Sequence, residues 1–271
     1  MSISAFLKRP DVRADPIRLL SRRIRLAAYR HAKPGQLSRR RTFRLTNGCL
    51  VRTTLDDVVG RGLYTHGTFE YEALAAWLAA LSDGAVAVDV GAHIGTFTLA
   101  AAQVVGPSGR VLAFEPNPQN RQGLVENLRL NGLSHRVTVF DCALSDREEL
   151  VSIGSPDPRN SGMSRLGVGH QEVKTRRLDD ILAELRIGSV AAMKIDVEGH
   201  ELQVLRGSSR SLDHIETLVI EVNGEDAMTY LRERGFTLRL PSGEPYRAEI
   251  EHREDGEALN VVAKALTASP K

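Results

Sequence analysis

The hydrophobic positions of this chain form short apolar runs, and between them lie longer segments in which apolar residues recur every three or four positions. The short runs predict strands and the longer segments predict helices. The predicted strands are VAVDV from Val86, RVLAFE, RVTVFD, SVAAMKID and TLVIE, followed near the end by FTLRL and ALNVVAKAL. Strands that alternate with helices predict an α/β fold, in which a doubly wound, mostly parallel sheet is covered on both faces. We expect the last two runs to be antiparallel.

Ahead of this alternation the chain has a different pattern. RTFRLTNGCLVRTT predicts two short strands joined at Asn47 and Gly48, which is a strong hairpin signal. A glycine-rich loop at 60–70 then leads into a helix that ends at Gly84, and Trp77 on its apolar stripe is expected to anchor the core.

The domain organisation that follows has three parts. Residues 1–45 form a basic N-terminal extension, residues 46–84 contribute a β-hairpin and a helix that lead into the core, and residues 85–267 form the central domain. Lys and Arg outnumber Asp and Glu by 13 to 2 in the extension and are outnumbered by 32 to 23 in the rest, so +11 balances −9 to give the net +2.

A basic leader of this kind predicts either a solvated arm or a contact surface for acidic lipid, nucleic acid or an acidic partner. Four of its apolar residues have near-helical spacing, which predicts an amphipathic basic helix. These residues are Ile17, Leu20, Ile24 and Ala28. Neither a long apolar run nor the apolar core of a signal peptide is present, so we expect a cytoplasmic protein.

Acidic residues close the predicted strands. They are Asp89, Glu115, Asp141, Asp196 and Glu221. The carboxyl ends of parallel strands share one edge of the sheet, where ligands of doubly wound folds bind. This coincidence therefore predicts a single acidic site at that edge.

The first strand breaks into a turn with Gly91 and Gly95, and a small-residue helix begins there. Such a turn lets a ligand approach the backbone, and the free amides at the helix start offer hydrogen bonds. The spacing is G-x-x-x-G rather than the G-x-G-x-x-G of dinucleotide sites. Asp89 beside the turn would repel a pyrophosphate and suits a cation, which favours S-adenosylmethionine. Glu115 is suited to accept hydrogen bonds from both ribose hydroxyls. The alternative is an NAD(P)-dependent oxidoreductase on a similar Rossmann-like sheet.

Four segments make the resemblance specific: DVGAHIGTFT, FEPNP, DCALSD and especially MKIDVEGHE. Together they resemble the motifs of the FkbM-type S-adenosylmethionine-dependent methyltransferases over roughly residues 65 to 225. The resemblance implies a class I methyltransferase fold with a seven-stranded, Rossmann-like sheet, and O-methylation of a hydroxyl on a sugar, polyketide or other secondary metabolite. His93 departs from the family's turn, where Asn is frequent, and either side chain can hydrogen-bond locally.

The resemblance also implies a set of cofactor contacts. The methionine part would lie between residues of the glycine turn, the ribose against the FEPNP motif, the adenine against the DCA segment, and the methyl group beside the fourth strand. Asp89, Gly91 and Gly95 would bracket the methionine part and Glu115 would hold the ribose. Asp141 with Cys142 or Ala143 would hold the adenine, and Asp196 would lie beside the methyl group. His93, Pro116 and Asn117, in the same segments, are further candidates for cofactor binding. Glu70, in the loop at 60–70, is a further candidate at the border of the cofactor.

Methyl transfer to an alcohol needs an aligned oxygen and one base. Asp196, Glu198 and His200 are the candidate catalytic residues: His200 has the most suitable ordinary pKa, and Asp196 has the best position. Lys194 is expected to pair with a strand-end acid, to orient substrate, or simply to face an edge.

An oxygen-ligand site for Mg²⁺ is a further expectation, with Asp196, Glu221 and Asn223 as its ligands. Such an ion would lower the pKa of a bound hydroxyl. The choice of acceptor is expected to depend on the loops at 60–70 and 154–170.

Overall fold

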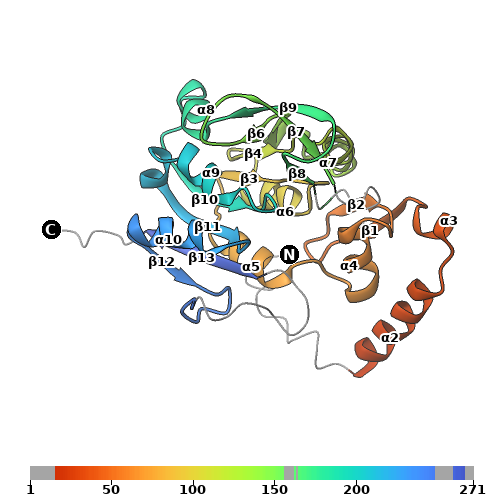
Figure 1. Ribbon diagram of the computed structural model, residues 1–271. Helices are drawn as coiled ribbons and strands as arrows, with labels where there is room; N and C mark the ends of the chain where they lie inside the picture. The colour runs from red at the N-terminus through yellow and green to blue at the C-terminus, as the bar shows by residue number, and fades with distance from the viewer. Residues whose placement is uncertain (1–15, 156–161, 163, 248–258, 266–271) are drawn as a thin grey trace.

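The computed structural model describes residues 16–155, 162, 164–247 and 259–265 (Figure 1). At its centre is a seven-stranded sheet with the order β12-β13-β11-β10-β3-β4-β5. The strands are β3 (Val86–Val90), β4 (Arg110–Phe114), β5 (Val137–Phe140), β10 (Val190–Ile195), β11 (Ile215–Glu221), β12 (Phe236–Arg239) and β13 (Asn260–Ala265). The predicted mostly parallel sheet is confirmed.

Only β13 runs against the other strands of this sheet, because it pairs antiparallel with both β11 and β12. The two last strands are therefore antiparallel to each other, as expected, while β12 keeps the direction of the parallel set. The strand β3 pairs in parallel with β4 on one side and with β10 on the other. The strand order thus reverses at β3, and a ligand site is expected beyond its carboxyl end.

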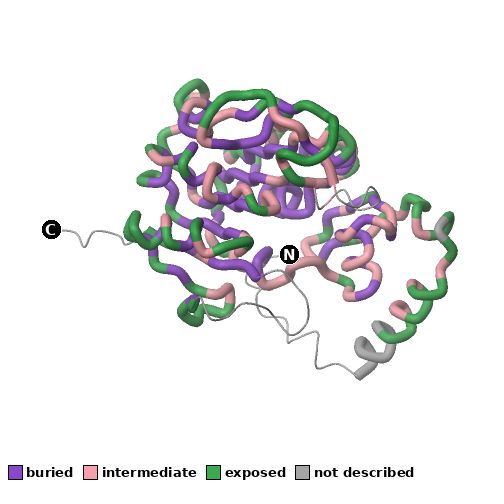
Figure 2. Tube along the Cα trace, in the orientation of Figure 1, coloured by how far each residue is buried: buried purple, intermediate pink, exposed green. Residues whose placement is uncertain are grey.

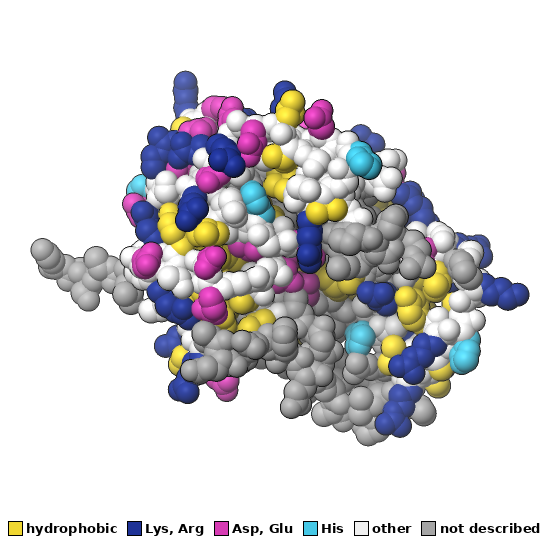
Figure 3. Space-filling model, in the orientation of Figure 1, with side chains coloured by type: hydrophobic (Ala, Val, Ile, Leu, Met, Phe, Trp, Pro, Cys, Tyr) yellow, Lys and Arg dark blue, Asp and Glu magenta, His cyan; other side chains and the backbone are white. Residues whose placement is uncertain are grey.

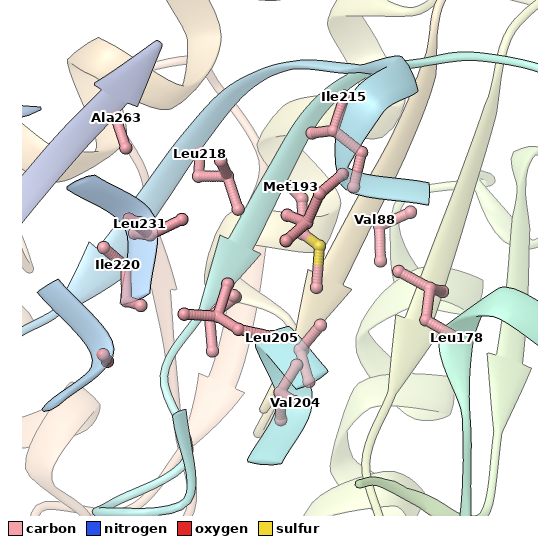
Figure 4. Packing of buried hydrophobic residues seen from close by; sticks show 14 of the residues in the cluster. Val88, Leu178, Met193, Val204, Leu205, Ile215, Leu218, Ile220, Leu231 and Ala263 are labelled. Atoms are coloured by element: carbon pink, nitrogen blue, oxygen red, sulfur yellow. The ribbon is translucent and has the colours of Figure 1, made fainter. Parts of the chain in front are cut away.

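Helices cover both faces of the sheet, and each face has its own core (Figures 1 and 2). The helices are α5 (Tyr71–Ala79), α6 (Thr96–Val104), α7 (Pro118–Leu130), α8 (Leu178–Glu184), α9 (Glu201–Gly207) and α10 (Glu225–Glu233). Trp77 of α5 is fully buried with Leu99 and Leu124 on one face, so its expected role as an anchor is confirmed. On the other face Met193 packs among Leu205 and Leu218 (Figure 4).

The hairpin is also confirmed. β1 (Arg41–Arg44) pairs antiparallel with β2 (Leu50–Thr53), and Gly48 takes a left-handed conformation in the turn. Val51 of β2 shares the core of Trp77. The division of the chain at 45 and 84 stays a prediction, although the segment from 46 to 84 shares the core of the central sheet.

The sequence was wrong in reading residues 60–66 as part of a loop. The helix α4 (Val58–His66) covers them, capped at its start by the carboxylate of Asp57. Glycine is unfavourable inside helices, but Gly60 is needed here because a Cβ at this position would overlap the carbonyl oxygen of Thr54. Gly60 thus reflects close packing of the helix on the end of β2, while Gly62 lies against the Phe69 ring.

A second, four-stranded sheet follows β5, with the order β6-β9-β7-β8. Its strands are β6 (Ala143–Leu144), β7 (Leu150–Gly154), β8 (Arg165–Leu166) and β9 (Gln171–Arg176). The third predicted strand is shorter than expected, because β5 ends at Phe140 and the chain then changes sheets. Two strand-like pieces around the loop at 154–170 are confirmed as β7 and β9.

The predicted basic helix is α2 (Pro16–Arg30), which contacts α4 and is followed by the short helix α3 (Pro34–Leu37). Ile24 is 62% exposed, so it does not serve as part of an inward-facing stripe. Basic side chains gather on this end of the molecule in Figure 3. Arg23, Arg30 and Arg39 of this segment are exposed. Among the described residues no helix has the length and apolar character needed to cross a membrane.

Candidate active site

The glycine turn after β3 is built by close backbone contacts with its neighbours. Gly91 has a φ of 82°, and a Cβ there would overlap the carbonyl oxygen of Asp196. Gly95, with a φ of 95°, leads into α6 and lies against Leu124 of α7. The absence of side chains at these positions brings the ends of β3 and β10 together, which is the arrangement expected from the sequence.

Asp89 lies at the end of β3 and is 0% exposed. Its Oδ2 accepts a hydrogen bond of 2.5 Å from the Thr98 hydroxyl, while its Oδ1 has no hydrogen-bond partner in the described part of the chain. Burial raises the pKa of Asp89, and the nearby charge of Lys194 opposes this shift. Buried carboxylate oxygens normally accept a hydrogen bond, so the unpartnered Oδ1 calls for a polar ligand group at the glycine turn.

Glu115 follows β4 and is 4% exposed. Its two carboxylate oxygens accept backbone N–H groups, one from His93 at 2.7 Å and one from Asn117 at 2.9 Å. Burial raises the pKa of Glu115, while the charge of His93 and these backbone bonds oppose the shift. The acid is therefore fixed in position by the glycine turn and by its own loop.

His93 stands in the middle of the glycine turn with a φ of 50°. Its Nε2 atom lies 3.1 Å from Oδ2 of Asp57, the residue that caps α4. Burial alone would lower the pKa of His93, but Asp57, Glu115 and Asp196 raise it above its ordinary value. These carboxylates therefore favour the protonated form of the imidazole.

The residues at the ends of β10 and β11 form a second charged group. Lys194 Nζ lies 2.7 Å from Asp196 Oδ2, and the Asp196 carboxylate also shares a hydrogen bond with Glu221. Burial would raise the pKa of Asp196, but Lys194 lowers it below its ordinary value. Burial and the charge of Asp196 raise the pKa of Glu221 to about 9. Lys194 thus favours the ionised form of Asp196, and burial beside that charge favours the protonated form of Glu221.

Glu198 completes the acidic group. One oxygen from each of Asp196, Glu198 and Glu221 lies within 4.8 Å of the others. Glu198 has a φ of 56° and pairs with Arg165 of β8 at 3.3 Å. Three of the four non-glycine residues with positive φ in the described ranges are site candidates, namely Glu70, His93 and Glu198. Strained backbone of this kind clusters at functional sites.

The remaining catalytic and metal candidates have partners of their own. His200 precedes α9, and its Nε2 lies 3.0 Å from the Ser145 hydroxyl. Burial lowers the pKa of His200. Asn223 donates its side-chain amide to Glu221 at 2.8 Å and to Glu201 at 2.9 Å. The structure therefore brings Asn223 to the acidic group but turns its amide nitrogen, rather than its oxygen, toward Glu221.

The candidates for the ribose and adenine lie at the ends of β4 and β5. Pro116 and Asn117 follow Glu115, and Asn117 both caps α7 and donates to the Ser164 hydroxyl at 3.0 Å. Cys142 and Ala143 are buried, and burial raises the pKa of the Cys142 thiol to about 11. Asp141 is exposed at the rim of an open groove of about 700 Å³ between β5 and α7.

Two residues of the site escaped the sequence analysis. Asp57 lies before the central domain, and nothing in its spacing connects it to His93. Thr98 lies in α6 and reaches Asp89 because residues separated by a tight turn face each other. The run Asp57-Val58-Val59 carries the signal of a helix N-cap, which would have revealed the local role of Asp57 but not its partner.

The strand order, with its single reversed strand, and the acids beyond the central strands define a class I methyltransferase. The sequence agrees with this class, since residues 89–238 match the model of the "Methyltransferase FkbM domain". The chain belongs to the FkbM methyltransferase family, and membership implies S-adenosylmethionine as the methyl donor. The oxidoreductase alternative has no support from this family.

Three relatives illustrate the family. The chain is 32% identical to the 31-O-demethyl-FK506 methyltransferase FkbM of Streptomyces tacrolimicus, over 58% of this chain and 75% of that protein. It is 30% identical to the hexuronic acid methyltransferase AglP of Haloferax volcanii, over 50% of this chain and 54% of that protein, so the match spans about half of that relative. It is 27% identical to the 2-O-methyltransferase NoeI of Sinorhizobium fredii, over 52% of this chain and 64% of that protein.

The residues at the sheet edge fit this cofactor in their chemistry. S-adenosylmethionine carries a sulfonium and an ammonium group and no phosphate. The acids Asp89, Glu115 and Asp196 converge on the edge, and the buried Asp89 Oδ1 is without a donor among the described residues. A cationic ligand suits such a donor set, whereas a pyrophosphate would be repelled.

Proposed function

We propose that this protein transfers a methyl group from S-adenosylmethionine to a hydroxyl group of a sugar, polyketide or other secondary metabolite. The proposal is supported by the acidic group at the ends of β3, β4 and β10, and by relatives whose names describe O-methylation or a sugar acid. The observation that carries it is the convergence of Asp89, Glu115 and Asp196 at one edge of the sheet.

In this proposal each acid has a separate task. Asp89 and the backbone of Gly91 and Gly95 hold the methionine part, and the fixed carboxylate of Glu115 accepts the ribose hydroxyls. The cofactor, when bound, supplies a methyl group on a sulfonium, which needs only an aligned nucleophile. His93 takes part through its backbone N–H, which holds Glu115.

Asp196 is the residue that we assign to the acceptor hydroxyl. Lys194 and Glu221 fix its carboxylate from two sides, so it presents a hydrogen-bond acceptor in a defined place. It orients the hydroxyl and receives its proton as the new C–O bond forms. His200, which hydrogen-bonds to Ser145, and Glu198, which pairs with Arg165, stay the alternative candidates for the base.

Binding of labelled S-adenosylmethionine tests the cofactor half of the proposal. We expect Glu115→Gln to weaken binding about tenfold to a hundredfold, as for a lost charge-assisted hydrogen bond. Asp196→Asn should bind the cofactor nearly as wild type and lose transfer to hydroxylated metabolites. Glu216→Gln, an exposed acid on β11, is the matched control. Equal binding by wild type and Glu115→Gln would show that the cofactor site is misplaced.

The Mg²⁺ ion expected at Asp196, Glu221 and Asn223 stays a prediction, and the described geometry adds Glu198 to its candidate ligands. A metal would have to displace the proton of Glu221, whose pKa is raised to about 9. Binding should therefore strengthen as pH rises. Calorimetric titration with Mg²⁺ at pH 6 and pH 9 tests this, and absence of heat at both values in the presence of cofactor would exclude the ion.

The contact of residues 1–45 with a membrane or an acidic partner, the expected absence of nucleic-acid binding and the cytoplasmic location also stay predictions. Residues 16–55 contain 11 Lys or Arg and neither Asp nor Glu, which supports an acidic partner for this end of the chain. Salt-dependent binding to anionic vesicles that is lost on deleting residues 1–33 would demonstrate such a contact.

A further inference from the structure

We infer that Asp57 and His93 form a positioning pair, through which the helix α4 holds the glycine turn and the ribose acid Glu115 in their binding geometry. The inference deepens the proposed function and rests on it, because it takes Glu115 as the ribose ligand. Neither residue is placed in contact with substrate, so both act through another group.

The Asp57 carboxylate has partners on both of its oxygens. Its Oδ1 accepts the backbone N–H groups of Val59 at 2.9 Å and Gly60 at 3.4 Å, which caps α4. Its Oδ2 lies 3.1 Å from Nε2 of His93. One buried side chain thus ties the start of α4 to the middle of the turn that follows β3.

His93 also has an unusual backbone conformation. A non-glycine residue with a φ of 50° is strained and persists only where its surroundings hold it. The contact with Asp57 supplies such a restraint from the side-chain end. At the backbone end the same residue donates its N–H to Glu115 at 2.7 Å. A restraint on the ring therefore also fixes the donor that orients the ribose acid.

Three carboxylates surround the His93 ring. The titratable groups that face the His93 imidazole are Asp57 from the start of α4, Glu115 from the end of β4 and Asp196 from the end of β10. Asp57 and Glu115 are both buried, and a buried carboxylate is costly without a cation or donors. The protonated form of the ring stabilises both carboxylates, and the ring and backbone of His93 contact Asp57 and Glu115 directly, so a change at either partner disturbs the turn and Glu115 together.

The pair also connects the family's domain to the segment that precedes it. Asp57 lies outside residues 89–238, which match the family model. The segment before that match therefore contributes to the cofactor site through α4. Its contribution is the contact of Asp57 with His93 in the glycine turn.

The test uses three variants and two ligands. Asp57→Asn keeps an N-cap side chain and removes the charge, because Asn and Asp cap helices equally well. His93→Asn keeps a residue that tolerates a positive φ. The double variant Asp57→Asn/His93→Asn removes both charges. The ligands are S-adenosylmethionine and its demethylated product S-adenosylhomocysteine, which share the ribose but differ by the sulfonium charge.

We expect each single variant to weaken binding of both ligands by about tenfold, and the double variant to return within about threefold of wild type, because the charges are again balanced. The KM for the acceptor should not change. Equal loss for the two ligands identifies positioning, since simple removal of a negative charge would weaken the cationic ligand alone.

Several outcomes would overturn the inference. It fails if Asp57→Asn and His93→Asn bind both ligands as wild type, if only S-adenosylmethionine is affected, or if the double variant shows the sum of the two losses. Should one single variant not fold, the other and the double variant carry the same comparison. If wild type binds neither ligand, or if Glu115→Gln binds as well as wild type, the proposed function fails instead.

Discussion

Lys194 Nζ lies 2.7 Å from Asp196 Oδ2 and 4.5 Å from the centre of the Phe97 ring, in a position where the lysine is only 3% exposed. Burial would lower the pKa of Lys194, but the charges of Asp196 and Asp89 raise it well above its ordinary value. A buried cation thus joins the acid of β3 to the acid of β10. Of the alternatives left open by the sequence, pairing with a strand-end acid is the one that the structure shows.

Lys194→Met should be strongly destabilising, because it leaves the buried Asp89 and the half-buried Asp196 without their cation. Breaking one partner out of a buried ion pair costs about 3–5 kcal/mol. Urea unfolding at neutral pH measures this loss of the free energy of unfolding. Lys174→Met, on the exposed side of β9, is the control and should change stability by less than about 0.5 kcal/mol. Similar losses for the two variants would contradict the central role of Lys194.

The raised pKa of Glu221 leads us to expect that the free energy of unfolding depends on pH. Its pKa is raised to about 9 in the folded protein from an ordinary value of 4.5, so the folded state holds a proton that the unfolded state has lost between these values. Stability from this group is therefore full below about pH 4.5 and is lost as pH rises toward 9, by up to about 1.4 kcal/mol per pH unit.

The variant Glu221→Gln isolates this effect, since a neutral amide imitates the protonated acid. Unfolding free energies measured from pH 5 to pH 9 should fall for wild type and change less for Glu221→Gln. The difference should grow with pH in favour of the variant. Parallel curves for the two proteins would show that Glu221 is ionised throughout this range in the folded state.

We expect Arg165 to affect the binding of the acceptor but not that of the cofactor. It reaches from β8 to Glu198 at 3.3 Å, at the edge of the loop expected to select the substrate. Arg165→Ala should raise the KM of the acceptor severalfold and leave the affinity for S-adenosylmethionine unchanged. Arg147→Ala removes an exposed pair with Glu149 and serves as the control. A changed cofactor affinity with an unchanged KM would place Arg165 in the other half of the site.

The sequence predicted the parallel sheet and the acids at its edge because both follow from local pattern. A buried strand is recognised from a short apolar run, and the carboxyl ends of parallel strands meet by topology alone. Asp89, Glu115 and Asp196 lie at those ends as expected. These parts of the fold require no knowledge of side-chain contacts.

The parts that were missed depend on contacts between distant segments. Nothing in the sequence pairs Asp57 with His93, and the helix α4 was hidden because its glycines are typical of loops unless the packing against Thr54 is known. The length of β5 depended likewise on where the chain enters the second sheet. The hydrophobic pattern predicts a helix or strand from the residues within it. These features depend instead on contacts with segments that are distant in the sequence.

Gly91 offers the sharpest test of how the two halves of the site are joined. Gly91→Ala would place a methyl group on the carbonyl oxygen of Asp196 at a φ of 82°, so the ends of β3 and β10 would have to separate. Gly132→Ala imposes a similar φ of 67° at the end of α7 with no atom within 4 Å, so it carries the backbone strain alone, about 1–2 kcal/mol. We expect Gly91→Ala to lose several kcal/mol more than this control in urea unfolding, and to lose cofactor binding if it folds. Equal losses would mean that strain in the turn, rather than its contact with Asp196, is what requires glycine.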